Sequence, residues 1–146
     1  MTRRQLHMDA VRHVSAKLAE MRVPVKATGL TAGLDLATPT HTIAVRGARL
    51  SRIIRYIEGV RYEYPGVRWN LHQHGVRRTA PDVWVLIVAD GRDWPCYIVP
   101  GHELVGRLTV EATMGQPATG RGRPRNGAIR PYLNAWGELR RRRVAA

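Results

Sequence analysis

The stretch that decides the fold is Val83-Trp84-Val85-Leu86-Ile87-Val88-Ala89, in which every residue is apolar. A strand with two apolar faces has to be covered on both sides, so we expect it in the middle of a layered sheet. The next residues, Asp90-Gly91-Arg92-Asp93, have the composition of a tight turn, and Trp94–Val99 returns as the partner strand. This strand pair is the expected centre of the molecule.

On either side of this pair, hydrophobic spacing predicts the other elements. Apolar residues three and four positions apart predict helices, and short apolar runs bounded by Gly or Pro predict strands. Residues 61–80 mix aromatic residues with Pro, Gly and many cations, and are predicted to be a long basic loop with a strand near Trp69 alone. The other predicted elements are a helix over 5–21, strands over 23–28, 34–38 and 42–46, a helix over 50–60, a short helix over 103–108 and a helix beginning at Pro131.

This order of elements predicts an α/β fold in a single domain, with a mixed central β-sheet flanked by helices. Residues 1–112 are the expected α/β core. Residues 113–128 are rich in Gly, Pro, Thr and Arg without periodicity, and are expected to form a flexible basic arm. Residues 129–146 are expected to form a C-terminal helix that packs on the core and ends in a basic tail. The helix residues expected to face the core are Leu133, Trp136 and Leu139 or Arg140.

The net charge is the strongest indication of function. The chain has 24 Lys and Arg residues against 11 Asp and Glu, which gives a net charge of +13 at pH 7. Two of the 24 cations, Lys17 and Lys26, are lysine, which leaves 22 arginines. A GC-rich genome can replace lysine by arginine, but it does not remove the acids that would balance the charge. Because arginine binds phosphate bidentately and stacks on bases, the excess predicts nucleic-acid binding, with DNA preferred to RNA.

The sequence also indicates where the protein works. The longest apolar run is only the length of a strand, and the residues after Met1 do not resemble a signal peptide, so no membrane association is expected. The single cysteine, Cys96, cannot form an internal disulfide and reads as a small buried hydrophobe. We therefore expect a cytoplasmic protein, nucleoid-associated or phage-encoded, with homodimer formation left open.

Five short motifs and Trp69 follow one another along nearly the whole chain. In this order they resemble the restriction-endonuclease-like PD-(D/E)XK superfamily, especially its small members related to intron-encoded endonucleases and Holliday-junction resolvases. The resemblance implies an α/β nuclease fold that hydrolyses DNA phosphodiesters with Mg²⁺. The motifs are Gly33-Leu34-Asp35-Leu36, Ile43-Ala44-Val45-Arg46-Gly47, Pro81-Asp82-Val83-Trp84-Val85-Leu86-Ile87, Cys96-Tyr97-Ile98-Val99-Pro100 and Tyr132-Leu133-Asn134-Ala135-Trp136-Gly137-Glu138-Leu139.

The active site that this resemblance implies is only partly present. Asp35 matches the first carboxylate and is the candidate metal ligand, although a turn-flanking aspartate on an exposed strand face is an equal alternative. Ala44 stands where a second acid or glutamine belongs, and a methyl group cannot bind a metal. Arg46 stands at the lysine position, where it keeps the charge but has a different reach. If the protein is an enzyme, Asp35 and Arg46 are the catalytic candidates and Mg²⁺ the cofactor.

Other acids could complete such a site. The family often carries a glutamate in its first helix, where this chain has Val11, with Asp9 or Glu20 as substitutes. A second acid could also have moved to Glu58 or Glu63. With one matched carboxylate, we expect the fold to bind DNA with weak or absent catalysis and no cofactor. The alternatives are a Mg²⁺-dependent endonuclease with a rearranged site, an RNA-binding or ribosome-associated protein, and a basic module that docks on an acidic protein.

The arm contains a recognisable DNA-binding pattern. Gly120-Arg121-Gly122-Arg123-Pro124-Arg125 resembles the core of the AT-hook, in which arginines enter the narrow minor groove of A·T-rich DNA. The alternative is a loop that grips phosphates without sequence preference. The candidate nucleic-acid contacts are Arg121, Arg123, Arg125, Arg130, Arg77, Arg78, Arg46 and Arg49.

Overall fold

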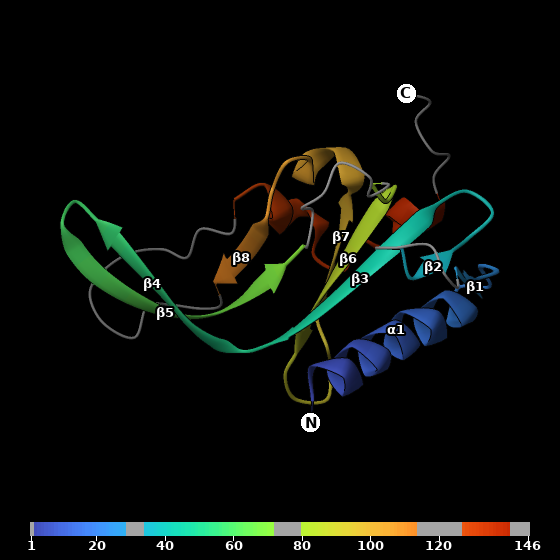
Figure 1. Cartoon of the computed structure of the whole chain (residues 1–146), viewed down its shortest axis with the longest axis horizontal. Helices are drawn as coiled ribbons and strands as arrows, with labels where there is room; N and C mark the ends of the chain where they lie inside the picture. Colours follow the sequence, from blue (N-terminus) through green and yellow to red (C-terminus); the bar gives the residue numbers. More distant parts are fainter. Residues whose placement is uncertain (1, 29–33, 72–79, 114–126, 141–146) are drawn as a thin grey trace.

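The computed structural model describes residues 2–28, 34–71, 80–113 and 127–140 of the chain. Its elements form three layers, with helix α1 on one face of a five-stranded sheet and a three-stranded sheet against the other face (Figure 1). The five-stranded sheet has the order β1-β2-β3-β6-β7 and the smaller sheet the order β4-β5-β8. The bounds are α1 Arg3–Glu20, β1 Lys26–Ala27, β2 Leu36–Ala37, β3 Thr42–Arg49, β4 Ser51–Ile57, β5 Val60–Asn70, β6 Val83–Ala89, β7 Cys96–Pro100 and β8 Thr109–Thr113, with 3-10 helices η1 Gly101–Leu104, η2 Gly127–Tyr132 and η3 Trp136–Arg140.

Strand β6 is the centre of the molecule, as its sequence predicts. It pairs in parallel with β3, with Ile43 opposite Val83, and antiparallel with β7, so the sheet is mixed and the α/β class is confirmed. Its alternate side chains enter two different cores. Val85 and Ile87 pack beneath α1, whereas Trp84 and Leu86 pack against the three-stranded sheet. Burial on both faces explains why the strand carries no polar position.

Helix α1 packs on one face of the five-stranded sheet, and one apolar stripe of the helix makes the contact. The hydroxyl of Thr2 caps it by accepting the backbone N–H of Gln5 at 3.0 Å. Gly47 on β3 allows the first half of the helix to approach closely, because a Cβ at this glycine would lie 3.2 Å from that of Ala10. The buried stripe consists of Leu6, Ala10, Val14 and Leu18.

Among the described residues, no helix has the length and apolar content needed to span a membrane.

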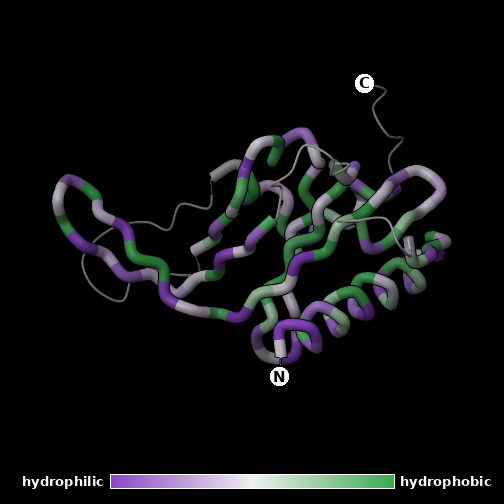
Figure 2. Tube along the Cα trace, in the orientation of Figure 1, coloured by the Kyte–Doolittle hydropathy of each residue, from purple (hydrophilic) through white to green (hydrophobic). Residues whose placement is uncertain are grey.

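The predicted helix over 50–60 is wrong, and so is the predicted loop over 61–70. These residues form β4 and β5, a long antiparallel hairpin with Ile57 opposite Val60. Its two-residue turn is Glu58-Gly59, and both residues have positive φ, 51° and 79°. Such a turn matches the twist of paired strands and suits glycine at its second position. Hydrophilic residues predominate along the outer part of the hairpin, interrupted by the isoleucines of β4 (Figure 2), and the helical spacing of those isoleucines is the pattern that predicted a helix.

Strand β8 was not predicted at all. It pairs antiparallel with β5, with Trp69 opposite Val110, and closes the smaller sheet. The indole N–H of Trp69 donates to the carbonyl oxygen of Ile87 at 2.9 Å, which ties this sheet to the larger one. The short helix predicted over 103–108 is reduced to η1, and Gly106 beyond it has a φ of 77°.

The predicted C-terminal helix is replaced by two short 3-10 segments, η2 and η3. Between them Asn134 has a φ of 52°, which an α-helix does not accommodate. Its backbone N–H donates to the carbonyl of Cys96 at 2.6 Å, and its side-chain oxygen accepts the N–H of Cys96 at 3.2 Å, so the turn is bound to β7. Leu139 is buried as expected, whereas Leu133 is 46% exposed.

The remaining predictions are met in part or fall outside the described residues. The hairpin over 34–38 and 42–46 is present as the antiparallel pair β2–β3, and the strand over 23–28 is shortened to β1. Most of the predicted arm over 113–128 and of the basic tail after Arg140 lies outside the described residues.

Candidate nucleic-acid interface

A groove of about 730 Å³ lies where the first turns of α1 meet β3 and β5. Five arginines from three separate parts of the chain line it, and none of its described lining residues is acidic. It therefore concentrates positive charge on one concave surface, to which a polyanion is attracted. The arginines are Arg3, Arg4, Arg46, Arg49 and Arg68.

The N-terminal end of α1 adds to the positive charge of the groove. The helix is 18 residues long, its first turn has no acidic residue, and Thr2, Arg3 and Arg4 at its start line the groove. Its unpaired N–H groups carry a partial positive charge, which favours phosphate groups near this end. The helix dipole and the arginine side chains thus act in the same direction.

Arg68 is held in place on β5 by an acid from the neighbouring strand. Its Nε donates to Oε1 of Glu111 at 2.6 Å, and Arg55 pairs with the other oxygen of the same carboxylate. Burial alone would raise the pKa of Glu111, but the hydrogen bonds and charges of Arg68 and Arg55 outweigh it and lower that pKa. Since 62% of the Arg68 side chain is exposed, its guanidinium keeps contact with solvent.

Beside this groove, the carboxylate of Asp35 contacts two of the groove's lining residues, His7 and Arg46. The backbone N–H of Asp35 donates to the carbonyl of Ile43, which continues the β2–β3 ladder by one residue. Its side chain then accepts the backbone N–H of Val45 at 2.7 Å, where β2 offers no further carbonyl. Only 16% of the side chain is exposed. Asp35 therefore completes the edge of β3 with its side chain.

Two further groups from the groove bind the same carboxylate. His7 on α1 donates from Nε2 to Oδ1 of Asp35 at 2.8 Å, and Nη1 of Arg46 lies 3.5 Å from Oδ2. Arg46 also donates to the carbonyl of Val45 at 2.8 Å, and its guanidinium lies 5.2 Å from the ring centroid of Trp84. Both carboxylate oxygens thus have donors at hydrogen-bonding distance.

These residues do not fit a Mg²⁺ ion, which prefers several carboxylate and water oxygens in an octahedral shell. Ala44 is fully buried between the two sheets, and the α1 residue that meets Asp35 is His7 rather than an acid. Within the described ranges, no three His, Cys, Asp or Glu residues are grouped so that they could hold a metal.

The other acids considered for the site lie elsewhere. Asp9 accepts from Gln5 and Arg12 on its own helix, and Glu20 pairs with Lys17. Glu58 is in the turn at the tip of the β4–β5 hairpin, which lies at the opposite end of the molecule from β2 (Figure 1). Glu63, on the same hairpin, is bound by two arginines of its own sheet, Arg52 and Arg61.

The predicted nucleic-acid contacts are divided by the fold. Arg46 and Arg49 line the groove, and Arg130 is exposed on η2. Four groove residues were missed by sequence reasoning. Arg3, Arg4 and His7 could have been found from the pair of arginines at a predicted helix start, whereas Arg68 was assigned to a loop. Five predicted contacts lie outside the described residues, namely Arg77, Arg78, Arg121, Arg123 and Arg125.

Comparison with known proteins bears on the fold alone. No protein-family model matches the chain, and no curated protein matches it. Among solved structures, a bacterial homing endonuclease, I-Ssp6803I, has a similar fold, with a TM-score of 0.58 over 95% of this chain and 93% of that chain. The two sequences are 13% identical in this alignment. The expected nuclease-like fold is thus confirmed.

Proposed function

We propose that this protein binds duplex DNA through the backbone phosphates and does not hydrolyse them. The observation that carries the proposal is the groove between α1, β3 and β5, which five arginines line without a described acid among the lining residues; two of them, Arg46 and Arg68, are paired with Asp35 and Glu111 beside it. Arginine forms two parallel hydrogen bonds to a phosphate, and each phosphate neutralised releases condensed counterions. The nuclease-like fold favours DNA over RNA as the polyanion.

The proposed lack of hydrolysis is supported by the hydrogen bonds of Asp35. A metal-dependent nuclease needs carboxylate oxygens that are free to bind the ion and to orient a water. Here the carboxylate accepts from Val45, His7 and Arg46, and the second acid position is an alanine within the core. In this proposal the side chains of Asp35, His7 and Arg46 stabilise the edge of β3 and the groove beside it, and do not take part in catalysis.

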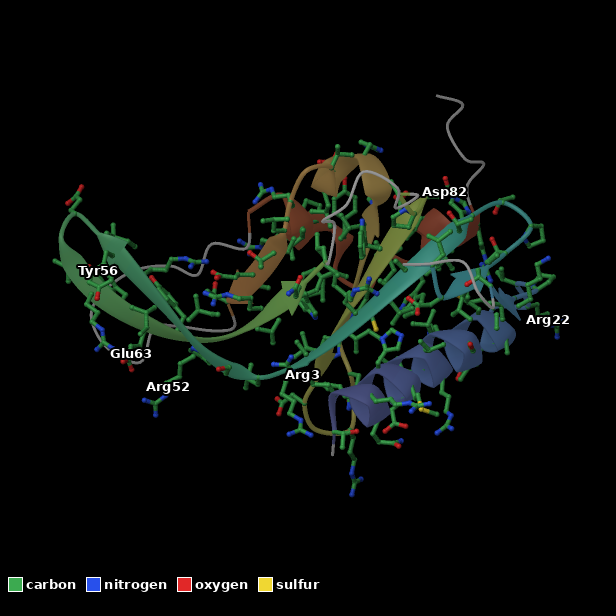
Figure 3. All side chains as sticks on the ribbon, viewed as in Figure 1. Arg3, Arg22, Arg52, Tyr56, Glu63 and Asp82 are labelled. Carbon is green, nitrogen blue, oxygen red and sulfur yellow. The ribbon has the colours of Figure 1, made fainter. Side chains whose placement is uncertain are left out.

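Binding is tested by fluorescence anisotropy with a mixed-sequence duplex of about thirty base pairs over a series of salt concentrations. We expect log Kobs to fall steeply with log salt, and the slope to decrease by about 0.9 for each groove arginine that contacts a phosphate. The variants are Arg3→Ala and Arg49→Ala. Arg22→Ala is the matched control, because Arg22 is exposed at the other end of α1 (Figure 3). Failure of the wild type to bind duplex DNA in low salt overturns the proposal.

Hydrolysis is tested with supercoiled plasmid in the presence of Mg²⁺ or Mn²⁺. We expect no nicking above the level given by Asp35→Ala. Nicking by the wild type that Asp35→Ala abolishes identifies a nuclease with a rearranged site and overturns the second half of the proposal. Competition by structured RNA at equal nucleotide concentration decides between DNA and RNA, and duplex DNA should compete better.

A further inference from the structure

The β4–β5 hairpin extends from the body of the molecule well beyond the two packed sheets (Figure 1). Its inner part is buried, since Val67 and Trp69 enter the core between the sheets. Its outer part exposes large apolar side chains, with Ile54 at 44% and Tyr56 at 71% exposure. A two-stranded ribbon of this kind is marginal alone in water, and exposed apolar residues on it indicate a binding surface.

The register assigns the exposed residues of the hairpin to one face. Residues directly opposite each other in an antiparallel pair point to the same side, and Ile54 faces Glu63 whereas Tyr56 faces Arg61. Alternate residues share that side, so Arg52 belongs to it as well. We call Arg52, Ile54, Tyr56, Arg61 and Glu63 the ribbon face. In Figure 3 the labelled members of this face lie along the outer half of the hairpin.

Two arginines of the ribbon face pair with the same carboxylate. Oε1 of Glu63 lies 2.8 Å from Nη2 of Arg61, and its Oε2 lies 3.7 Å from Nη1 of Arg52. One carboxylate therefore serves two guanidiniums, and the cluster keeps one net positive charge. The Arg52 and Arg61 side chains are still 81% and 53% exposed. Arginines oriented in this way lose less conformational freedom when they bind a ligand.

We propose that the β4–β5 hairpin enters the major groove of duplex DNA with its ribbon face toward the base edges. This inference rests on the proposed function and adds to it the groove and the element that reads it. The major groove, about 12 Å wide, admits a two-stranded ribbon, whereas the minor groove, about 6 Å wide, does not. Arg52 and Arg61 supply donors for guanine edges or phosphates, and Ile54 and Tyr56 supply apolar contact with thymine methyl groups.

Charge favours DNA over a second copy of this chain on the same face. The ribbon face contains two arginines and one glutamate, a net charge of +1, because Arg55 and Arg68 lie on the other side of the hairpin and pair with Glu111. Pairing two copies through this face would place like charges against each other, which is unfavourable. DNA phosphates carry the opposite charge and would attract the same face. The arginine groove lies at the base of the same hairpin, because Arg68 and Asn70 of β5 line it.

The test compares two duplexes of one sequence, with either ordinary cytosine or glucosylated 5-hydroxymethylcytosine, whose sugar fills the major groove. The wild type should bind the glucosylated duplex about tenfold more weakly. Arg52→Ala combined with Tyr56→Ala should bind ordinary duplex about tenfold more weakly and no longer distinguish the two DNAs. Val105→Ala combined with Arg22→Ala is the matched control, since Val105 is 69% exposed outside the hairpin and should change neither result.

Each outcome bears on one of the two proposals. Equal, salt-dependent binding of both duplexes by the wild type overturns the inference and leaves DNA binding intact. Equal discrimination by the wild type and the double variant overturns it too, because another element then occupies the major groove. Absence of any duplex binding overturns the proposed function itself. Thermal denaturation monitored by circular dichroism establishes that the double variant is folded, as the exposure of both substituted residues leads us to expect.

A chemical cross-link provides an independent measurement. Tyr56→Cys should exchange with a mixed disulfide tethered to cytosine N4 in the major groove, releasing the small thiol of the tether, and not with one tethered to guanine N2 in the minor groove. The native Cys96 does not interfere, because it is buried and burial raises the pKa of its thiol to about 12. Cross-linking to the minor-groove tether alone overturns the inference.

Discussion

The carboxylate of Asp35 lies 2.7 Å from the backbone nitrogen of Val45 and accepts its N–H, where a longer β2 would have offered a carbonyl. The residue that matches a nuclease metal ligand thus acts as a hydrogen-bonding extension of the sheet. Val45 is fully buried, so leaving its N–H without an acceptor would destabilise the folded protein. The same arrangement orients His7 and Arg46 at the groove.

Replacing Asp35 should therefore affect stability. We expect Asp35→Ala to lower the free energy of unfolding by about 2 kcal/mol, because Val45 and the mostly buried Arg46 lose their acceptor. Asp35→Asn keeps an oxygen for the Val45 N–H and should cost about half as much. Urea denaturation measures both, with Asp93→Ala in the exposed β6–β7 turn as the control. A stability of Asp35→Ala equal to that of wild type contradicts the structural role.

The Glu111 carboxylate should make stability depend on pH in the acid range. Its pKa in the folded protein is lowered from 4.5, since the pairing with Arg68 and Arg55 outweighs the opposing effect of burial. Its contribution is therefore complete above 4.5 and is lost as the pH falls through the lowered value. Glu111→Gln should be less stable than wild type by about 1 kcal/mol at neutral pH and equal to it in strong acid. Urea denaturation at both pH values checks this, and a difference that persists in acid contradicts it.

The turn of the hairpin should be improved by a residue that accepts positive φ. Glu58 has a φ of 51°, and asparagine is favoured in this position of a two-residue hairpin turn. We expect Glu58→Asn to raise stability by about 0.5 kcal/mol, measured as an increase in Tm. Glu58→Ala is the matched control and should not stabilise, because alanine disfavours this conformation. A Tm of Glu58→Asn equal to or below that of wild type contradicts this prediction.

The arm is proposed to add its own contacts with DNA. Replacing Arg121, Arg123 and Arg125 together with alanine should lower the salt slope of binding by about 0.9 for each phosphate contact removed. An AT-hook-like contact further predicts that wild type prefers an A·T-rich duplex to a G·C-rich one, and that the triple variant loses this preference. Anisotropy titrations with both duplexes measure the two effects. An unchanged slope removes the arm from the interface.

Much of the architecture could be predicted because it is local. The continuous apolar run of β6 and the apolar stripe of α1 each contain their full pattern within one segment. The β4–β5 hairpin was mistaken for a helix because Ile53, Ile54 and Ile57 have helical spacing, and the strand signal depends on Glu58 and Gly59 both adopting positive φ. Strand β8 depends on a partner about forty residues earlier, so its own five residues indicate little.

Some residues of the candidate site could likewise be predicted from local sequence and others could not. Arg46 and Arg49 were found because they follow a recognisable strand motif. Arg3 was overlooked although it stands beside the predicted helix start, and Arg68 because it reaches the groove only through the pairing of β5 in a strand that was not predicted. Asp35 was identified as important, but its hydrogen bonds to Val45 and His7 depend on where β2 stops.

By itself, the sequence determined a basic, layered α/β protein, because hydrophobic periodicity and net charge are sums over neighbouring residues and do not require coordinates. The tertiary structure decided which arginines share one surface and what the oxygens of Asp35 bind. Those properties follow from hydrogen-bond directions and close packing between residues far apart in the chain, and these act over a few ångströms in space whatever the separation in sequence.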